Sequence, residues 1–424
     1  MTLIETPSTR AKLLSFLRGS AGLAVAIMVM NVATYSFQLA AAHRLGPESY
    51  GGVASLMALL LVIGVVQLGL QATAARRIAA EPEHVGTIER VMRSVTFRAS
   101  LAMGALMLVL SPLVWHVLRL DSIVPALLVA VTAVPTTMTG GQAGILQGER
   151  RWLPLSILYL AIGLPRVLIG TICIVVSATE TAAMLGVAVA MFAPVLVGWW
   201  ALRRPRPDLD TEISPEQAHD HGFRAVAREG LRSSVALLAF FVLSNMDIVI
   251  ARNTLTHHQA GLYAGGLILT KAVLFLPQFI VVIAFPSMST EGERRKSLLQ
   301  ALSAVTLAGV VSIAGAWLLS GIAMIFIGGS EYSDVQHKLW LYAVIGTMLS
   351  LLQMLIYSVL ARQHRGASIL VWVAVVALAV VGLTMSTLMS LILTVVAIDT
   401  ALTLLLLGLS LWHLRDESPT ATPA

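Results

Sequence analysis

Long apolar stretches follow one another along almost the whole 424-residue chain, separated by short polar segments. Each stretch has roughly 20 residues or more, the length that an α-helix needs to cross the hydrocarbon core of a membrane. They are too long and too continuously apolar for strands of a membrane β-barrel. The pattern predicts an all-α membrane protein with about twelve spans, at residues 20–42, 51–73, 97–118, 122–146, 153–176, 181–202, 231–251, 262–285, 301–327, 339–361, 367–386 and 389–413.

Composition supports a chain whose surface faces lipid. Hydrophobic residues make up 57% of it and charged residues only 12%, about half the share that soluble domains carry. The net charge of +6 comes from basic residues in short loops, which is a topology signal and not a nucleic-acid patch. The one cysteine, Cys173, lies in an apolar stretch, and the histidines form no spaced motif. We therefore expect no cofactor and no metal site.

Lysine and arginine alternate strongly between the two sides of the predicted bundle. Of the 28, 22 fall on one side, four on the other and two inside helices. The positive-inside rule assigns the basic side, and with it both termini, to the cytoplasm. The first stretch is longer than the hydrophobic region of a signal peptide, so we expect it to remain as an uncleaved span.

The longest polar segment, 203–230, divides the chain into six helices and six helices. We predict an N-terminal lobe at 1–202, a cytoplasmic linker at 203–230, and a C-terminal lobe with a short tail at 231–424. Because six is even, both halves enter the membrane in the same orientation, as parallel repeats do. A shift of 213 residues places Tyr50-Gly51-Gly52 on Tyr263-Ala264-Gly265.

Several short motifs resemble those of a known family. They are LGPESYGG (Leu45 to Gly52), Gln67-Leu68-Gly69-Leu70, Asn245-Met246-Asp247, AGLYAGG (Ala260 to Gly266) and Phe285-Pro286. The chain resembles the polysaccharide transporters and oligosaccharide flippases, which include the Wzx proteins. They belong to the multidrug, oligosaccharidyl-lipid and polysaccharide exporter superfamily. The resemblance implies two six-helix lobes around a central cavity, alternating access, a bacterial cytoplasmic membrane, and a polyprenyl-pyrophosphate-linked glycan as substrate.

Two of the charged residues inside predicted spans are Asp247 and Lys271, near the outer ends of their helices. Charges at such depth are unfavourable and usually face a bundle interior or a wet cavity. One interpretation is a structural ion pair between them. The other is functional: Lys271 binds a substrate phosphate and Asp247 exchanges a proton or an ion.

The other two are Arg166 and Asp399. Arg166 follows Pro165, which should kink the helix, and a guanidinium group binds phosphate with a planar fork. We predict that it contacts an anionic headgroup, the alternatives being a pair with Asp399 or a bond to a free carbonyl near Pro165. Asp399 lies in mid-span, where a carboxyl group either couples transport to an ion or serves a structural role.

Uncharged polar residues recur at helical spacing on other spans. They are predicted to line the cavity, although polar residues also simply join membrane helices. The set is Asn31, Thr34, Tyr35 and Gln38 on the first span, Ser244, Gln278 beside Lys271, and Gln353.

These observations favour a flippase that moves a lipid-linked oligosaccharide for cell-surface polysaccharide synthesis. No Walker motif is present, so an ion gradient is the expected energy source. The alternative is a cation-coupled multidrug antiporter on the same fold. An enzyme is not expected, because the outward loops, such as 43–50, are too short for a catalytic site. Expected partners are the lipid-linked glycan, membrane lipids, and a polysaccharide polymerase or glycosyltransferases, with no nucleic acid.

Overall fold

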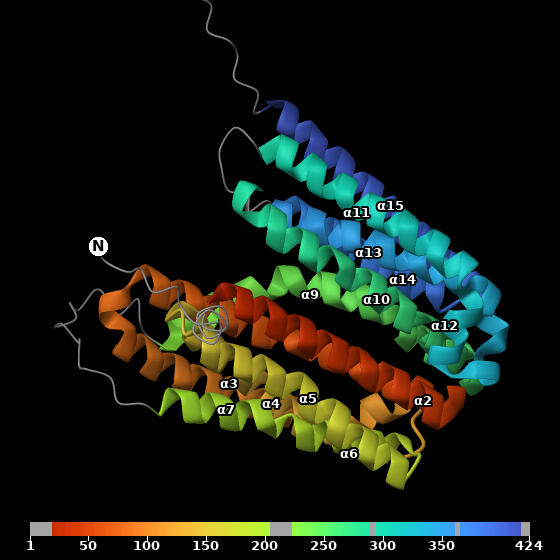
Figure 1. The fold of residues 1–424 in the computed structure, drawn as a ribbon, viewed down its shortest axis with the longest axis horizontal. Coiled ribbons are helices and arrows are strands. Elements are labelled where there is room, and N and C mark those ends of the chain that lie inside the picture. Colours follow the sequence, from red (N-terminus) through yellow and green to blue (C-terminus); the bar gives the residue numbers. More distant parts are fainter. Residues whose placement is uncertain (1–18, 204–222, 289–293, 361–364, 417–424) are drawn as a thin grey trace, which may run out of the picture. The chain divides into compact units, whose positions relative to one another are not determined.

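The computed structural model describes residues 19–203, 223–288, 294–360 and 365–416 (Figure 1), and within these ranges the chain is helical and contains no strand. Side chains are described over 19–203, 237–274, 299–356 and 369–410. The described part contains nine helices that are long and apolar enough to cross a membrane. The predicted spans fall on helices, although 20–42 and 51–73 share the segment Ser20–Ala80, 181–202 and 301–327 each contain two helices, and the helix within 367–386 ends at Gly382. The all-α membrane fold is confirmed.

The chain forms two compact units. Unit 1 contains residues 1–44 and 56–237, and unit 2 contains 45–55 and 238–424. The segment 45–55 therefore belongs to the unit formed by the second half of the chain. The lobe boundaries drawn from the linker remain a prediction.

Unit 1 is built around the fourth predicted span. Its elements are most of α2 (Ser20–Ala80), η1 (Pro82–His84), α3 (Val85–Val117), α4 (Val124–Gly148), α5 (Trp152–Val176), α6 (Glu180–Ala190) and α7 (Phe192–Leu202). Helix α4 contacts α3, α5, α6 and α7. Gly140 and Gly144 lie directly against the backbone of α2 at Gln67 and Gln71. Small residues allow helices to approach closely where lipid supplies no hydrophobic driving force.

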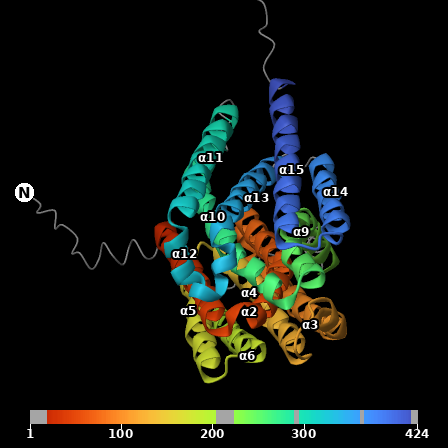
Figure 2. The same cartoon turned by 90° about the vertical axis from the view of Figure 1, so that its right-hand side faces the viewer.

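Unit 2 repeats this plan around its own fourth span. Its elements are α9 (Phe223–Thr254, from Leu238), α10 (His257–Met288), α11 (Arg294–Leu318), α12 (Ser320–Ile327), η2 (Gly329–Lys338), α13 (Leu339–Leu360), α14 (Arg365–Gly382) and α15 (Leu388–Asp416). Helix α13 contacts α10, α11 and α15 (Figure 2). The same position in each half thus forms the centre of its unit, which agrees with parallel repeats.

The predicted loop at 43–50 is wrong. Within α2 the first two spans are two helices that meet directly at Gly46, whose φ of 67° lies in the left-handed region. Glycine adopts this conformation without a steric penalty, and Pro47 then begins the second helix, since a first-turn proline loses no hydrogen bond.

The predicted start of the third span, at residue 97, is also wrong. Helix α3 begins at Val85, because Ile88, Met92 and Val95 recur at helical spacing and pack in the hydrophobic core of unit 1. The charged residues between them had suggested a loop. Helices α9 and α11 likewise begin earlier than predicted, at Phe223 and Arg294.

The segment 45–55 packs closely on the start of α10. A Cβ atom on Gly261 would overlap the carbonyl group of Pro47, and one on Gly51 would lie 3.2 Å from the Gly261 Cα atom. Tyr50 and Tyr263 are both buried at this junction. The two short family-like motifs therefore contain the glycines that let two backbones meet.

Replacing Gly261 with alanine tests this contact. Because the added methyl group overlaps backbone and not a movable side chain, we expect Gly261→Ala to lower the free energy of unfolding by about 1–3 kcal/mol. The matched control is Gly315→Ala in α11, where a Cβ meets nothing within 4 Å. Unfolding in mixed detergent micelles measures both; equal stability of the two variants would contradict the close packing.

Candidate functional site

A cluster of ionisable and polar side chains lies inside unit 2, contributed by four helices. Asn245 and Asp247 come from α9, Tyr263 and Lys271 from α10, Tyr342 from α13 and Asp399 from α15. Both aspartates, Asn245 and both tyrosines are buried, and Lys271 is half-buried. Buried polar groups in a membrane need partners inside the protein.

Asp247 is held by donors of its own unit. Its Oδ2 atom accepts a hydrogen bond of 2.9 Å from the Tyr263 hydroxyl, and its Oδ1 atom accepts one of 2.8 Å from the backbone N–H of Ile248. The Tyr263 and Tyr342 rings meet edge to face, with centroids 5.6 Å apart. The carboxylate is thus oriented by a tyrosine from the neighbouring helix.

Lys271 does not form the direct ion pair with Asp247 that was one interpretation of the sequence. Its Nζ atom donates to the Ser244 carbonyl oxygen at 2.8 Å and to Asn245 Oδ1 at 2.9 Å. The lysine and the aspartate still interact electrostatically at longer range. The ammonium group is therefore secured by neutral acceptors and not by a carboxylate.

Asp399 is only partly satisfied within this cluster. Its side chain is buried, and Oδ1 has no hydrogen-bond partner among the described residues. It interacts electrostatically with both Asp247 and Lys271. Two carboxyl groups thus share one ammonium group, so one negative charge has no counter-charge in this cluster when both are ionised.

Arg166 lies in unit 1, on α5 directly after Pro165. Its Nη2 atom is 3.2 Å from the sulfur atom of Met191, where α6 ends and α7 begins. Its Nε atom is buried and has no hydrogen-bond partner in the described part of the chain. No carboxylate of unit 1 pairs with it among the described residues. A thioether is a weak acceptor, so most of the guanidinium's donor capacity is left for another group.

The predicted cavity-lining residues differ in their surroundings. Asn31, Thr34, Tyr35 and Gln38 are half-buried on α2, and Gln353 is half-buried on α13. Ser244 is buried, and its hydroxyl donates to the Phe241 carbonyl at 3.3 Å. The side chain of Gln278 lies outside the described residues. The lining role of all seven stays a prediction.

Sequence reasoning missed the roles of Asn245, Tyr263 and Tyr342. Asn245 and Tyr263 were singled out only as parts of family-like motifs, and Tyr342 gave no signal. Hydrogen-bond partners on different helices become visible only when the helices are packed. Within the described residues no group of histidine, cysteine and acidic side chains is suited to a metal ion.

Comparisons with known proteins place this geometry in context. The family model described as "Polysaccharide biosynthesis protein" matches residues 16–291. No curated protein sequence matches the chain.

Solved structures resemble the chain over nearly its full length. An inward-facing multidrug resistance MATE family transporter of the MOP superfamily has a TM-score of 0.72 at 14% identity, covering 92% of this chain and 96% of its own. An outward-facing conformation of such a transporter has a TM-score of 0.64 at 14% identity, with 95% and 97% covered. A MOP superfamily transporter from Pyrococcus furiosus, whose binding pocket is described as having reverse polarity, has a TM-score of 0.62 at 14% identity, also with 95% and 97% covered. At these identities the likeness shows the fold.

Tyr263 and Tyr342, whose rings meet edge to face, provide a matched test of the Asp247 environment. We expect Tyr263→Phe to lower the free energy of unfolding by about 1–3 kcal/mol, because it leaves a buried carboxylate oxygen without its side-chain donor. Tyr342→Phe should be close to neutral, because the Tyr342 hydroxyl has no partner among the described residues. Unfolding in mixed micelles compares them. Equal losses in both variants would show that removing a buried hydroxyl, and not breaking the bond to Asp247, carries the effect.

Proposed function

The chain belongs to the polysaccharide biosynthesis protein family, and we propose that it is a flippase that translocates a polyprenyl-pyrophosphate-linked oligosaccharide by alternating access. Family and fold are those of multi-pass membrane transporters and not of enzymes. The inferred location is the bacterial cytoplasmic membrane, with both termini in the cytoplasm, as the distribution of basic residues favours.

The observation that carries this proposal is Arg166. A guanidinium group inside a span is unfavourable unless something compensates it, and Arg166 has a thioether neighbour, a buried Nε atom without a partner, and no acid of its own unit. A pyrophosphate offers several negatively charged acceptors, which an arginine fork binds strongly. The bound headgroup would then supply the counter-charge that unit 1 lacks.

Lys271 is the second cation proposed to bind the headgroup. Before the headgroup binds, the lysine donates to its two neutral acceptors. Its hydrogen bonds go to a carbonyl and an amide oxygen, so no carboxylate occupies its Nζ donors and an arriving anion can replace these acceptors. The polar residues Asn31, Thr34, Tyr35, Gln38, Ser244, Gln278 and Gln353 are proposed to contact the glycan, while the lipid tail stays in the bilayer.

Asp247 and Asp399 are proposed to couple transport to a proton or sodium gradient. The support is the shared charge: when both are ionised, one carboxylate has no counter-charge in its cluster, and a proton or cation supplies it. Release of this cation would reset the transporter. The lipid-linked glycan, and a polymerase or glycosyltransferases that make or use it, are the proposed partners.

A second candidate is a cation-coupled multidrug antiporter, favoured by the structural likeness to MATE transporters. It would depend chiefly on the two aspartates. The unpaired arginine favours an anionic substrate and thus the flippase, and the two functions separate in the experiments below.

Flipping of a fluorescent polyprenyl-pyrophosphate glycan in proteoliposomes tests Arg166. We expect Arg166→Met to slow translocation about tenfold or more, since a lost charged hydrogen bond is worth about 1.5–3 kcal/mol. Its stability should fall little, because the only described bond that is lost is the weak one to the Met191 sulfur atom. Arg166→Lys, which keeps the charge and loses the fork, should be intermediate.

Wild-type flipping by Arg166→Met would reject the headgroup role. No translocation by the intact protein, across several glycans and imposed gradients, would favour the antiporter.

Gradient-driven transport tests the aspartates. We expect Asp399→Asn to abolish the acceleration of transport by an imposed proton or sodium gradient, because the titratable or cation-binding group is removed. The control is Asp334→Asn, an exposed aspartate in η2 of the same unit. Full gradient response in Asp399→Asn would exclude this residue from coupling.

A further inference from the structure

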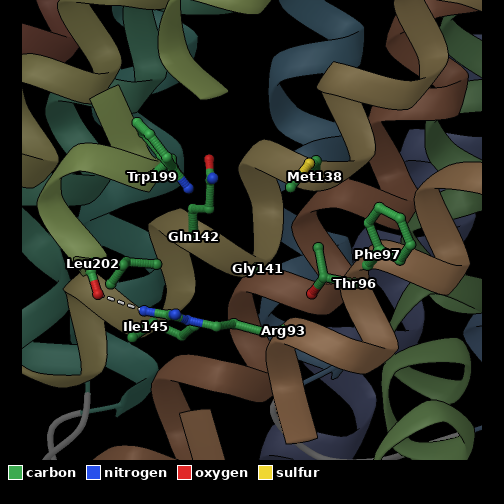
Figure 3. A pocket seen from close by; sticks show the side chains of 9 residues that line it. All are labelled: Arg93, Thr96, Phe97, Met138, Gly141, Gln142, Ile145, Trp199 and Leu202. Atoms are coloured by element: carbon green, nitrogen blue, oxygen red, sulfur yellow. Dashed lines mark hydrogen bonds between the residues drawn. The ribbon is translucent and has the colours of Figure 1, made fainter. Parts of the chain in front are cut away.

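A pocket of about 210 Å³ opens on the surface of unit 1, separate from the charged residues discussed above. It lies between α3, α4 and α7 and is lined mainly by apolar side chains, as Figure 3 shows. Phe97 and Trp199 are each about half exposed, at 52% and 51%. These exposed aromatic walls make the mouth of the pocket apolar, which suits a lipid acyl chain.

Two buried polar side chains line this apolar pocket. Thr96 is 3% exposed and Gln142 is 7% exposed. The Thr96 hydroxyl and the Gln142 Oε1 atom have no hydrogen-bond partner in the described part of the chain. The Gln142 amide nitrogen is used, because it donates to the Val195 carbonyl oxygen at 3.2 Å. The wall of the pocket therefore contains one buried hydroxyl that can donate or accept and one buried amide oxygen that needs a donor.

Glycines keep both groups in place. A Cβ atom on Gly141 would overlap the Thr96 hydroxyl, and one on Gly198 would overlap the Gln142 amide. Two glycines thus make room for a hydroxyl and an amide oxygen that have no hydrogen-bond partner in the described chain. Unsatisfied polar groups inside hydrocarbon are costly, which points to a ligand that satisfies them.

The end of the pocket next to Arg93 and Leu202 carries positive charge. Arg93 reaches across it and donates to the Leu202 carbonyl oxygen at 2.5 Å (Figure 3), and it pairs with Glu89 one turn earlier. Arg203 stacks on Trp199, with its guanidinium carbon 3.5 Å from the ring centroid. Two arginines against one glutamate leave this end positive, at the arginine-rich membrane face.

We propose that this pocket binds one anionic phospholipid of that leaflet, of the phosphatidylglycerol class. The phosphate faces Arg93, an acyl chain lies along Phe97, Met138 and Trp199, and headgroup or ester groups bond to Thr96 and Gln142. Basic pockets between membrane helices are suited to such headgroups. Phosphatidylglycerol carries both a net negative charge and hydroxyl donors. Phosphatidylethanolamine has a donor without net charge, and phosphatidylcholine has neither. This lipid is a resident ligand and not the transported substrate.

Photoreactive analogues of these three lipids, with the reactive group in the acyl chain, test the proposal on the full-length protein in nanodiscs. Mass spectrometry reads the fraction of peptides labelled at Phe97, Met138 or Trp199, with unlabelled lipid as competitor. We expect phosphatidylglycerol to label best and phosphatidylcholine least. Thr96→Val, which removes the hydroxyl at nearly constant volume, should weaken competition by phosphatidylglycerol about tenfold.

The matched control is Thr139→Val on α4, a buried threonine outside the pocket whose hydroxyl bonds to the Pro135 carbonyl; its labelling should equal that of the wild type. Met138→Trp should fill the pocket and abolish labelling while folding is preserved. Equal labelling by all three lipids, or Thr96→Val and Thr139→Val behaving alike, would overturn the proposal.

Discussion

The structure depends on one constraint: the hydrocarbon core supplies no water to satisfy a polar group. The backbone answers by forming helices, and the helices associate where small residues bring them into contact. Gly140 and Gly144 do this for α4 and α2, and Gly261 does it for α10 and the segment 45–55. Every charged side chain inside a span then needs a partner, either within the protein or from a bound substrate or ion.

The fold could be predicted almost completely from the sequence, because span length and apolar composition follow directly from bilayer thickness. The predictions that were wrong concern where helices begin and end. The loop predicted at 43–50 shrinks to one glycine, Gly46, because a positive φ needs a single residue. The early start of α3 arises from Ile88, Met92 and Val95, which pack within the protein although charged neighbours interrupt the apolar run.

For the candidate site, the sequence identified the charged residues and not their partners. A charged residue within an apolar stretch can be recognised from the sequence alone. Lys271 bonds Ser244 and Asn245, and Asp247 bonds Tyr263. These pairings depend on how α9 and α10 pack, so the spacing of residues along the sequence does not predict them. The pocket beside Gln142 was missed for the same reason: threonine and glutamine are ordinary in membrane helices, and only their lack of partners marks them.

The cations of the two units differ in a way that bears on mechanism. Lys271 is satisfied by neutral acceptors, so it tolerates an empty site. Arg166 retains a buried Nε atom with no partner among the described residues, so its unit gains most from an anion. In the proposed function, an anion at Arg166 meets donors that have no described partner, whereas an anion at Lys271 exchanges for the bonds to Ser244 and Asn245. Headgroup binding would then alter unit 2 beside Asp247 and Asp399, where a proton or cation is proposed to act. A substrate that binds Lys271 changes the lysine's hydrogen bonds close to Asp399, which has no counter-charge of its own. Substrate binding and release of the coupled ion would then be linked through these neighbouring side chains.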